Sequence, residues 1–250
     1  MGERTSYPPG TFSWAELVTT DADSAKAFYS ALLAWDYDDQ PVGDDQVYSM
    51  VARDGKHVAA LYADESQPPH WNCYVTVESV DESTAKAKAA GGAELHEPFD
   101  VMDVGRMAFV ADPAGAAIFL WEPRQHIGAH LVNAPGSLTW NDLITPDPDG
   151  AARFYGDLFG WTFEELPDME GYRVIKNGDR ENGGVFPRED APPGWIPYFG
   201  HEDVERAIAD VPGLGGRVLN GPVQMWQGSI GVFGDPQGAP FALWTGHYDD

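Results

Sequence analysis

The stretch Trp14–Trp35, WAELVTTDADSAKAFYSALLAW, returns 126 residues later as Trp140–Trp161, WNDLITPDPDGAARFYGDLFGW. The positions of the first copy that are identical in the second include Trp14, Leu17, Thr19, Asp21, Ala25, Phe28, Tyr29, Leu32 and Trp35. A Pro-Gly pair, beginning at Pro9 and at Pro135, precedes both copies. Self-similarity at a fixed spacing indicates a duplicated structural unit, so the two halves of the chain are expected to share one fold.

Each copy has the pattern of a short strand followed by an amphipathic helix. The strands are predicted over Ser13–Thr19 and Thr139–Thr145. Within Ala25–Leu32 the apolar residues are spaced i, i+3, i+4, i+7, which places them on one face of a helix. Asp23 and Asp147 are the expected helix N-caps.

A second kind of unit follows each copy, with a helix that stops at a Gly-Gly pair and a later D-P-x-G turn. The turns begin at Asp112 and Asp235. Each unit is predicted to contain one strand, one helix and three further strands, βαβββ. The predicted units are 11–65, 70–122, 136–190 and 194–246, which gives a first domain 1–122, a linker 123–135 and a second domain 136–250.

Charge and composition exclude several classes of partner. The 250 residues carry a formal net charge of −25, which opposes binding to nucleic acid and to anionic membranes, because both need cationic surfaces. No signal-peptide pattern and no run of about 18 apolar residues occurs, so we expect a cytoplasmic protein. The single cysteine, Cys73, lies in an apolar strand pattern and is expected to be buried. Monomer and homodimer both remain open.

The order of these signals resembles a known superfamily. The carrying patterns are a strand, T-x-D and a helix ending in F-Y-x-x-L-x-x-W, then a unit with G-G and D-P-x-G. They are similar to those of the vicinal oxygen chelate superfamily, which includes glyoxalases, bleomycin-resistance proteins and extradiol dioxygenases. Within it the chain is most similar to two-domain glyoxalase-like proteins of antibiotic-producing bacteria that are often labelled hydroxylases. The resemblance implies an α+β fold in which four βαβββ units pair into two domains, with curled mixed sheets enclosing cup-shaped pockets.

Metal-using members of this superfamily take their ligands from the first and last strands of each unit. The resemblance places those positions at Trp14, Asn72, Phe119, Trp140, Ile196 and Ala242. None of these side chains is a good first-row metal ligand, and a competent site needs about three converging histidines or carboxylates. We therefore expect no metal and no other cofactor. The seven histidines, including His126, are interpreted as surface or loop residues.

Strand alternation places an acid beside the first tryptophan of each repeat. Trp14 shares a strand face with Glu16, and Trp140 shares one with Asp142. Glu16 and Asp142 are the candidate catalytic residues, and the candidate ligand-binding residues are Trp14, Asn72, Tyr74, Phe119, Trp140 and Tyr198.

The alternative for all the tryptophans is a place in the core. We expect Trp35 and Trp161, which follow the helices, to be core residues. For Trp14 and Trp140 the two readings stay equally open, because an acid two residues away on the same face is costly to bury without a purpose. The more polar first half is favoured as the functional one.

Three functions remain in competition. In the first, the protein binds a small aromatic or quinonoid molecule in secondary-metabolite tailoring or resistance. An amine-bearing ligand is included, because a cation would pair with Glu16 or Asp142. In the second, one of these carboxylates is the general base of a metal-free isomerase, hydroxylase or lyase. In the third, a metal-dependent lyase or dioxygenase uses non-standard ligands.

Overall fold

The computed structural model describes residues 2–42, 46–167, 169–225 and 227–248. The elements of the first half are β1 (Phe12–Thr19), α1 (Ala22–Leu33), β2 (Asp36–Val42), β3 (Gln46–Arg53), β4 (Lys56–Ala63), β5 (His70–Thr76), α2 (Val80–Ala89), β6 (Ala93–Val101), β7 (Gly105–Ala111) and β8 (Ala117–Pro123). Those of the second half are β9 (Leu138–Thr145), α3 (Pro148–Phe159), β10 (Thr162–Glu165), β11 (Arg173–Asn177), β12 (Arg180–Pro187), β13 (Gly194–Gly200), α4 (Val204–Asp210), the short 3-10 helix η1 (Val211–Leu214), β14 (Arg217–Met225), β15 (Gly228–Gly234) and β16 (Pro240–Gly246).

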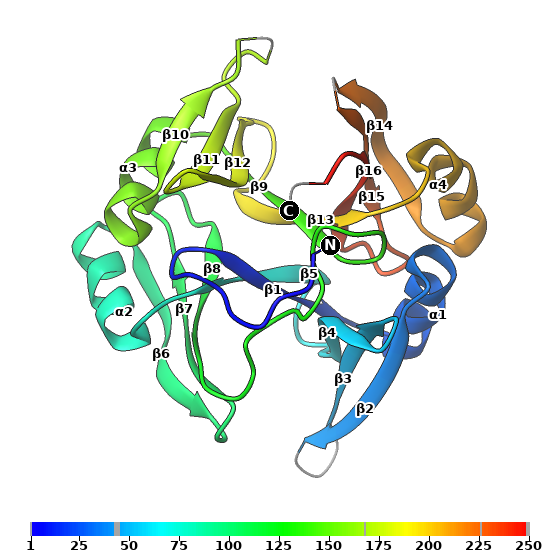
Figure 1. The fold of residues 1–250 in the computed structure, drawn as a ribbon, viewed down its shortest axis with the longest axis horizontal. Coiled ribbons are helices and arrows are strands. Elements are labelled where there is room, and N and C mark those ends of the chain that lie inside the picture. The colour runs from blue at the N-terminus through cyan, green and yellow to red at the C-terminus, as the bar shows by residue number, and fades with distance from the viewer. Residues whose placement is uncertain (1, 43–45, 168, 226, 249–250) are drawn as a thin grey trace.

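Each half forms one mixed eight-stranded sheet. The strand orders are β2-β3-β4-β1-β5-β8-β7-β6 and β10-β11-β12-β9-β13-β16-β15-β14. At the centre of each sheet the first strands of two units pair antiparallel, β1 with β5 and β9 with β13. The α+β fold of four βαβββ units is confirmed, although the sheets curl without closing. Figure 1 shows the two sheets curling away from each other.

The repeated stretch forms the predicted strand and helix, with a different residue at the start of the first helix. Asp21, not Asp23, caps α1, because Asp21 has the extended backbone of an N-cap and accepts a hydrogen bond from the Ser24 N–H at 3.0 Å. Asp23 lies in the first turn, where a carboxylate interacts favourably with the helix dipole. Asp147 caps α3 as predicted, accepting from the Gly150 N–H at 2.8 Å.

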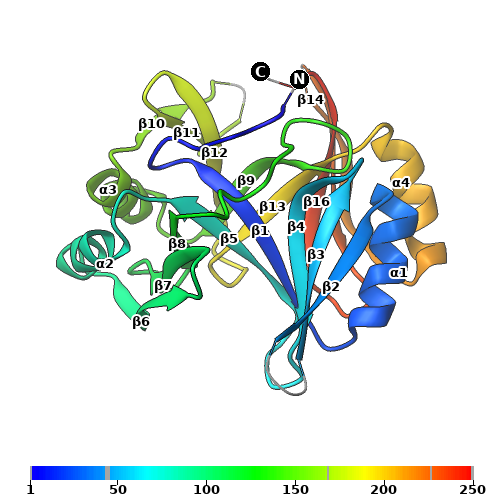
Figure 2. The same cartoon turned by 60° about the horizontal axis from the view of Figure 1, so that its bottom comes forward.

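Two buried clusters each draw side chains from both halves. Figures 1 and 2 show α1 beside α4 and α2 beside α3. One cluster packs Phe28 of α1 against Phe241 of β16, with ring centroids 6.0 Å apart, and the other packs Phe12 of β1 against Trp195 of β13, 4.9 Å apart. A separated half would therefore expose the apolar face of its helices to water.

The last tryptophan of each repeat joins the two halves. Trp35 Nε1 donates to the Gly136 carbonyl at 2.7 Å, and Trp161 Nε1 donates to the Gly10 carbonyl at 2.7 Å. These carbonyls belong to the Pro-Gly turns that precede the opposite copies of the repeat. Trp35 and Trp161 are 2% and 3% exposed, so their predicted core position is confirmed.

The connection between the sheets packs along the first sheet. Pro123 is still part of β8, and the Ala129 N–H donates to the Ser13 carbonyl of β1 at 2.8 Å. Ala129 and Val132 are buried. Figure 2 shows this segment passing along β1 on its way to β9. Elsewhere, Cys73 is buried as predicted. No helix in the described ranges has the length and hydropathy to cross a membrane.

Candidate functional site

Strand pairing brings the predicted residues of the first half onto one face of the first sheet. Trp14 of β1 lies opposite Tyr74 of β5, and Glu16 lies opposite Asn72. Tyr74 in turn lies opposite Phe119 of β8. We call the face that carries these five residues the first cup.

The second sheet repeats this arrangement with three substitutions. Trp140 lies opposite Tyr198, and Asp142 lies opposite Ile196. Ala242 of β16 pairs with Tyr198, in the place that a phenylalanine takes in the first half. These five residues define the second cup. The two cups face away from each other, because the backs of the sheets pack together (Figure 1).

Glu16 is buried and accepts three side-chain hydrogen bonds. Tyr48 Oη donates to Oε2 at 2.7 Å, Tyr74 Oη donates to Oε1 at 3.0 Å, and Asn72 Nδ2 donates to Oε1 at 3.2 Å. Burial raises the pKa of Glu16. The three hydrogen bonds oppose that rise, because they stabilise the charged carboxylate.

Asp142 is held in the same way. Tyr198 Oη donates to Oδ2 at 2.6 Å, Tyr172 Oη donates to Oδ1 at 2.8 Å, and Trp140 Nε1 donates to Oδ1 at 2.9 Å. Burial raises the pKa of Asp142, and these three bonds oppose the rise. The indole N–H supplies the third bond because Ile196, which replaces the amide of the first cup, has no donor.

Tyr48 and Tyr172 are site residues that the sequence reasoning missed. Because β4 lies between β3 and β1, Tyr48 reaches Glu16 across an intervening strand, and Tyr172 reaches Asp142 across β12 in the same way. A weak signal existed, since both tyrosines follow the carboxylates at similar distances along the chain, 32 and 30 residues. Only the sheet order shows that they meet the carboxylates.

The intervening strand carries a small side chain at the crossing point. Ala60 lies opposite Glu16, and Gly184 lies opposite Asp142. A Cβ at Gly184 would collide with the Tyr172 hydroxyl and with the Asp142 carboxylate. An aspartate is one methylene shorter than a glutamate, so the tyrosine must come closer to the sheet, and glycine leaves the room for it.

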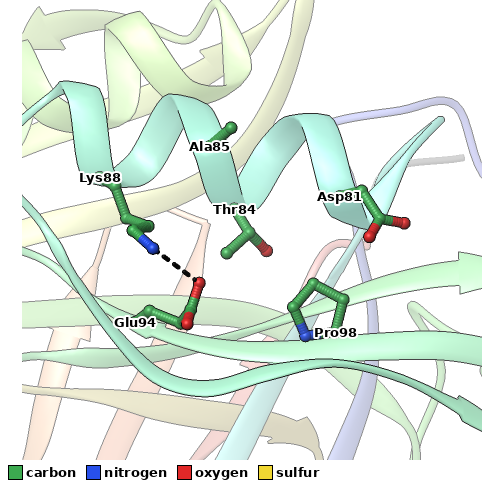
Figure 3. Close-up of a pocket in the computed structure, with 6 residues that line it drawn as sticks. All are labelled: Asp81, Thr84, Ala85, Lys88, Glu94 and Pro98. Atoms are coloured by element: carbon green, nitrogen blue, oxygen red, sulfur yellow. Dashed lines mark hydrogen bonds and ion pairs between the residues drawn. The ribbon is translucent and has the colours of Figure 1, made fainter.

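The first cup is filled by its own side chains. Trp14, Asn72, Tyr74 and Phe119 are each less than 10% exposed. In the second cup Tyr198 is also buried, but the Trp140 side chain is only half-buried. A surface groove between α2 and β6 lies outside both cups and contains an ion pair between Lys88 and Glu94 (Figure 3); its lining residues are Asp81, Thr84, Ala85, Lys88, Glu94 and Pro98.

His126 lies in the loop after β8, in line with the expected surface or loop position, but its side chain is half-buried. Its ring packs edge-on against Trp14, with centroids 4.7 Å apart, and lies 5.8 Å from the Trp121 ring. Trp121 Nε1 donates to the His126 carbonyl at 2.8 Å. Burial, reinforced by the nearby His57 and His130, lowers the pKa of His126 to about 4. The sequence did not indicate this contact, which forms because the chain beyond β8 folds back over the first cup.

The donors in the two cups do not fit a first-row metal. Each cup holds one carboxylate, and the surrounding hydroxyl and N–H groups direct their hydrogens at it. Within the ranges that the structure describes, no three His, Cys, Asp or Glu side chains form a group that could bind a metal ion. The positions where the resemblance places metal ligands do meet at the centre of each sheet. The residues there are not metal ligands; they are Trp14, Asn72 and Phe119 in the first sheet and Trp140, Ile196 and Ala242 in the second.

Two family descriptions and several relatives match the chain. Residues 11–120 match the Glyoxalase/Bleomycin resistance protein/Dioxygenase superfamily, and residues 139–244 match a glyoxalase-like domain. The chain is 42% identical over 254 residues to the putative glyoxylase CFP32 of Mycobacterium tuberculosis, covering 97% of both. It is 29% identical over 266 residues to the anthracycline biosynthesis protein DnrV of Streptomyces peucetius, covering 96% of this chain and 94% of that protein.

Solved structures with the same fold include a metal enzyme and a dioxygenase. The Mn(II)-bound glyoxalase from Novosphingobium aromaticivorans has a TM-score of 0.69 and 17% identity, covering 98% of this chain and 83% of that one. The 2,3-dioxygenase LapB from Pseudomonas sp. KL28 has a TM-score of 0.69 and 16% identity, covering 96% and 94%. At such identities the likeness shows the fold alone. With the sequence matches over both halves, it follows that the chain belongs to the glyoxalase, bleomycin resistance protein and dioxygenase superfamily.

Proposed function

We propose that the protein binds a small planar aromatic or quinonoid molecule of the polyketide-like class without a metal, and acts in its tailoring or in resistance to it. The observation that carries the proposal is the content of the cups, in which aromatic rings surround a single buried carboxylate. The relative DnrV supports the ligand class, because its name refers to anthracycline biosynthesis and anthracyclines are planar aromatic polyketides.

Aromatic stacking favours such ligands on physical grounds. In the first cup the Phe119 ring lies 4.9 Å from Tyr74 and 4.3 Å from Phe109. In the second cup the Trp140 indole is held by its N–H and leaves ring surface half-exposed. A stacked aromatic pair contributes about 0.5–1.5 kcal/mol beyond its buried area, so several such contacts support micromolar binding, about −8 kcal/mol.

The donor set of the two cups supports metal independence, which elemental analysis can test directly. The proposal expects purified protein to contain no stoichiometric zinc, iron, nickel or manganese by elemental analysis. It also expects ligand affinity to be unchanged after dialysis against a chelator. About one equivalent of metal per chain that survives dialysis, or binding that disappears on chelation, would favour the metal-dependent alternative with unusual ligands.

A metal-free enzyme is the second candidate, and one contact favours it. Tyr48 is half-buried and its hydroxyl donates to Glu16 at 2.7 Å. The tyrosine thus contacts a carboxyl group whose pKa is raised by burial. Such a pair can pass a proton from a substrate to the carboxylate. Asp142 and Tyr172 form the same pair in the second half. The 42% identical relative is named as a putative glyoxylase, which also fits an enzyme.

Binding and catalysis are separated by neutral variants of the two acids. We expect a neutral anthracyclinone to quench tryptophan fluorescence saturably in the wild type, in Glu16→Gln and in Asp142→Asn. If either variant binds normally but loses turnover of a quinonoid substrate, the carboxylate acts as a base and the enzyme candidate holds. If no planar polycyclic molecule quenches the fluorescence of the wild type at up to millimolar concentration, the binding proposal is wrong.

A further inference from the structure

The two cups share a backbone arrangement but differ in how much of their faces is covered. At four pairs of positions matched by strand register, the residue is buried in the first half and half-buried in the second, whereas Tyr198 and Ala242 are as buried as Tyr74 and Phe119. The matched pairs are Trp14 and Trp140, Asn72 and Ile196, Trp121 and Trp244, and Met107 and Ile230. The second cup therefore exposes a largely apolar face that the first cup keeps covered.

The first cup is covered by the chain itself. The His126 ring packs on Trp14 and Trp121, and the segment that carries it continues through buried Ala129 and Val132. Further along the sheet, the Phe119 ring fills the space beside Tyr74. In the first half, an internal aromatic ring thus occupies the position in front of the repeated tryptophan.

The second cup lacks these fillings among the described residues. Trp140 makes no ring contact with a described aromatic side chain. Ala242 takes the place of the phenylalanine beside Tyr198, so no phenyl ring extends from this position of the second cup. Trp244 Nε1 donates to the His247 carbonyl at 3.0 Å, which parallels the bond from Trp121 to His126, so the strand ends alike in both halves.

Building on the proposed function, we propose that the second cup is the ligand site, and that a neutral aromatic ring binds there against Trp140 as the His126 ring binds against Trp14. The first cup serves as an internal template for that complex. The ring is neutral because three hydrogen bonds already stabilise the Asp142 carboxylate and both of its oxygens have a partner, so a cation would gain little there. The low pKa of His126 agrees, since the template ring is uncharged at neutral pH.

Titration with quinizarin, a neutral planar hydroxyquinone, tests this assignment. We expect one site per chain by calorimetry, and about 5-fold weaker binding by Trp140→Phe, because a phenyl ring stacks over less area than an indole. The matched variant Trp14→Phe should bind as the wild type does. Ile196→Trp, which fills the second cup from a half-exposed position, should abolish binding.

A gain of binding gives the sharper test. His126→Ala removes the template ring and should raise the stoichiometry from one quinizarin to two, and the extra site should disappear in the double variant with Trp14→Phe. The inference would be overturned if Trp14→Phe weakened quinizarin binding while Trp140→Phe left it unchanged. Two sites in the wild type would overturn it as well. If His126→Ala bound quinizarin and the wild type did not, the inference would be wrong, but the proposed function would stand. No binding by any variant would remove the proposed function and the inference with it.

Discussion

The two cups hold the same polar centre inside different surroundings. In each, a buried carboxylate accepts one hydrogen bond from a tyrosine on the neighbouring strand and another from a tyrosine two strands away. Around this centre the first cup is packed with rings, whereas the second carries Ile196 and Ala242 at the matched positions. The comparison teaches that the same sheet face can be filled by the chain itself in one half and left half-exposed at matched positions in the other.

The backs of the sheets show the opposite behaviour, because there the two halves remain matched. Tyr29 donates to Asp235 at 3.2 Å, and Tyr155 donates to Asp112 at 3.3 Å, each across the contact between halves. The duplication has kept the surface that holds the halves together and has varied the surface that faces outward. Predictions that compare matched positions therefore test this division.

The largest losses of stability are expected for substitutions where the two halves pack against each other, and matched substitutions there should cost the same. Trp35→Ala and Trp161→Ala each remove a fully buried indole and its hydrogen bond to the opposite half. Each should lower the free energy of unfolding by about 3–5 kcal/mol. Urea denaturation measures both. A difference of more than about 2 kcal/mol between the variants would show that the backs are not equivalent.

Exchanging alanine and glycine at Ala60 and Gly184, which lie beneath Tyr48 and Tyr172, should destabilise the protein by different amounts. Gly184→Ala forces a Cβ against Tyr172 and Asp142, and overpacking of this kind costs about 1–3 kcal/mol. Ala60→Gly removes a Cβ from a strand and should cost about 0.5–1 kcal/mol. Thermal unfolding of both variants gives the order. Equal losses would contradict the view that the aspartate requires a glycine beneath its tyrosine.

The buried acids make stability depend on pH in a known direction. The pKa of Glu16 is raised by burial, so its neutral form stabilises the fold at low pH, and this contribution is lost as pH rises through the folded-state pKa. Glu16→Gln cannot ionise, so its stability relative to the wild type should increase between about pH 4 and pH 8. Urea denaturation at several pH values measures the difference.

Asp81→Asn is the control of opposite sign. Hydrogen bonds from Arg106 lower the pKa of exposed Asp81, so its contribution is present at neutral pH and is lost as pH falls through the folded-state pKa. The variant should therefore lose stability relative to the wild type mainly at neutral pH. The same direction of change for Glu16→Gln and Asp81→Asn would rule out the burial effect on Glu16.

The smallest effect concerns ligand charge. Because Glu16 and Asp142 already accept three hydrogen bonds each, an amine-bearing planar ligand should bind within about 3-fold of its neutral analogue at 0.5 M salt, where long-range attraction by the net charge of −25 is screened. Calorimetry on a matched ligand pair tests this. A large preference for the amine that Asp142→Asn or Glu16→Gln removes would instead establish a direct ion pair, as the sequence suggested.

The sequence predicted the parts of the molecule that depend on local pattern. The spacing of Ala25 to Leu32 is enough to place one face of a helix, and alternation along β1 is enough to put Trp14 and Glu16 on one side. Because the stretch is repeated, the same helix face and the same strand alternation could be predicted for the second half. The missed tyrosines and the missed role of His126 are contacts between segments far apart in the chain, about which local periodicity carries no information.

What the sequence determined by itself is the set of four units, their duplication and the acid beside each repeated tryptophan, because these follow from residue spacing over one or two turns or strands. Tertiary structure alone decided that both carboxylates are held by tyrosines reaching across a strand, and that the backs of the halves share two cores. It alone also decided that Trp14 lies beneath His126 while Trp140 stays half-exposed. Burial depends on which distant segment covers a face, and that is settled only when the whole chain packs.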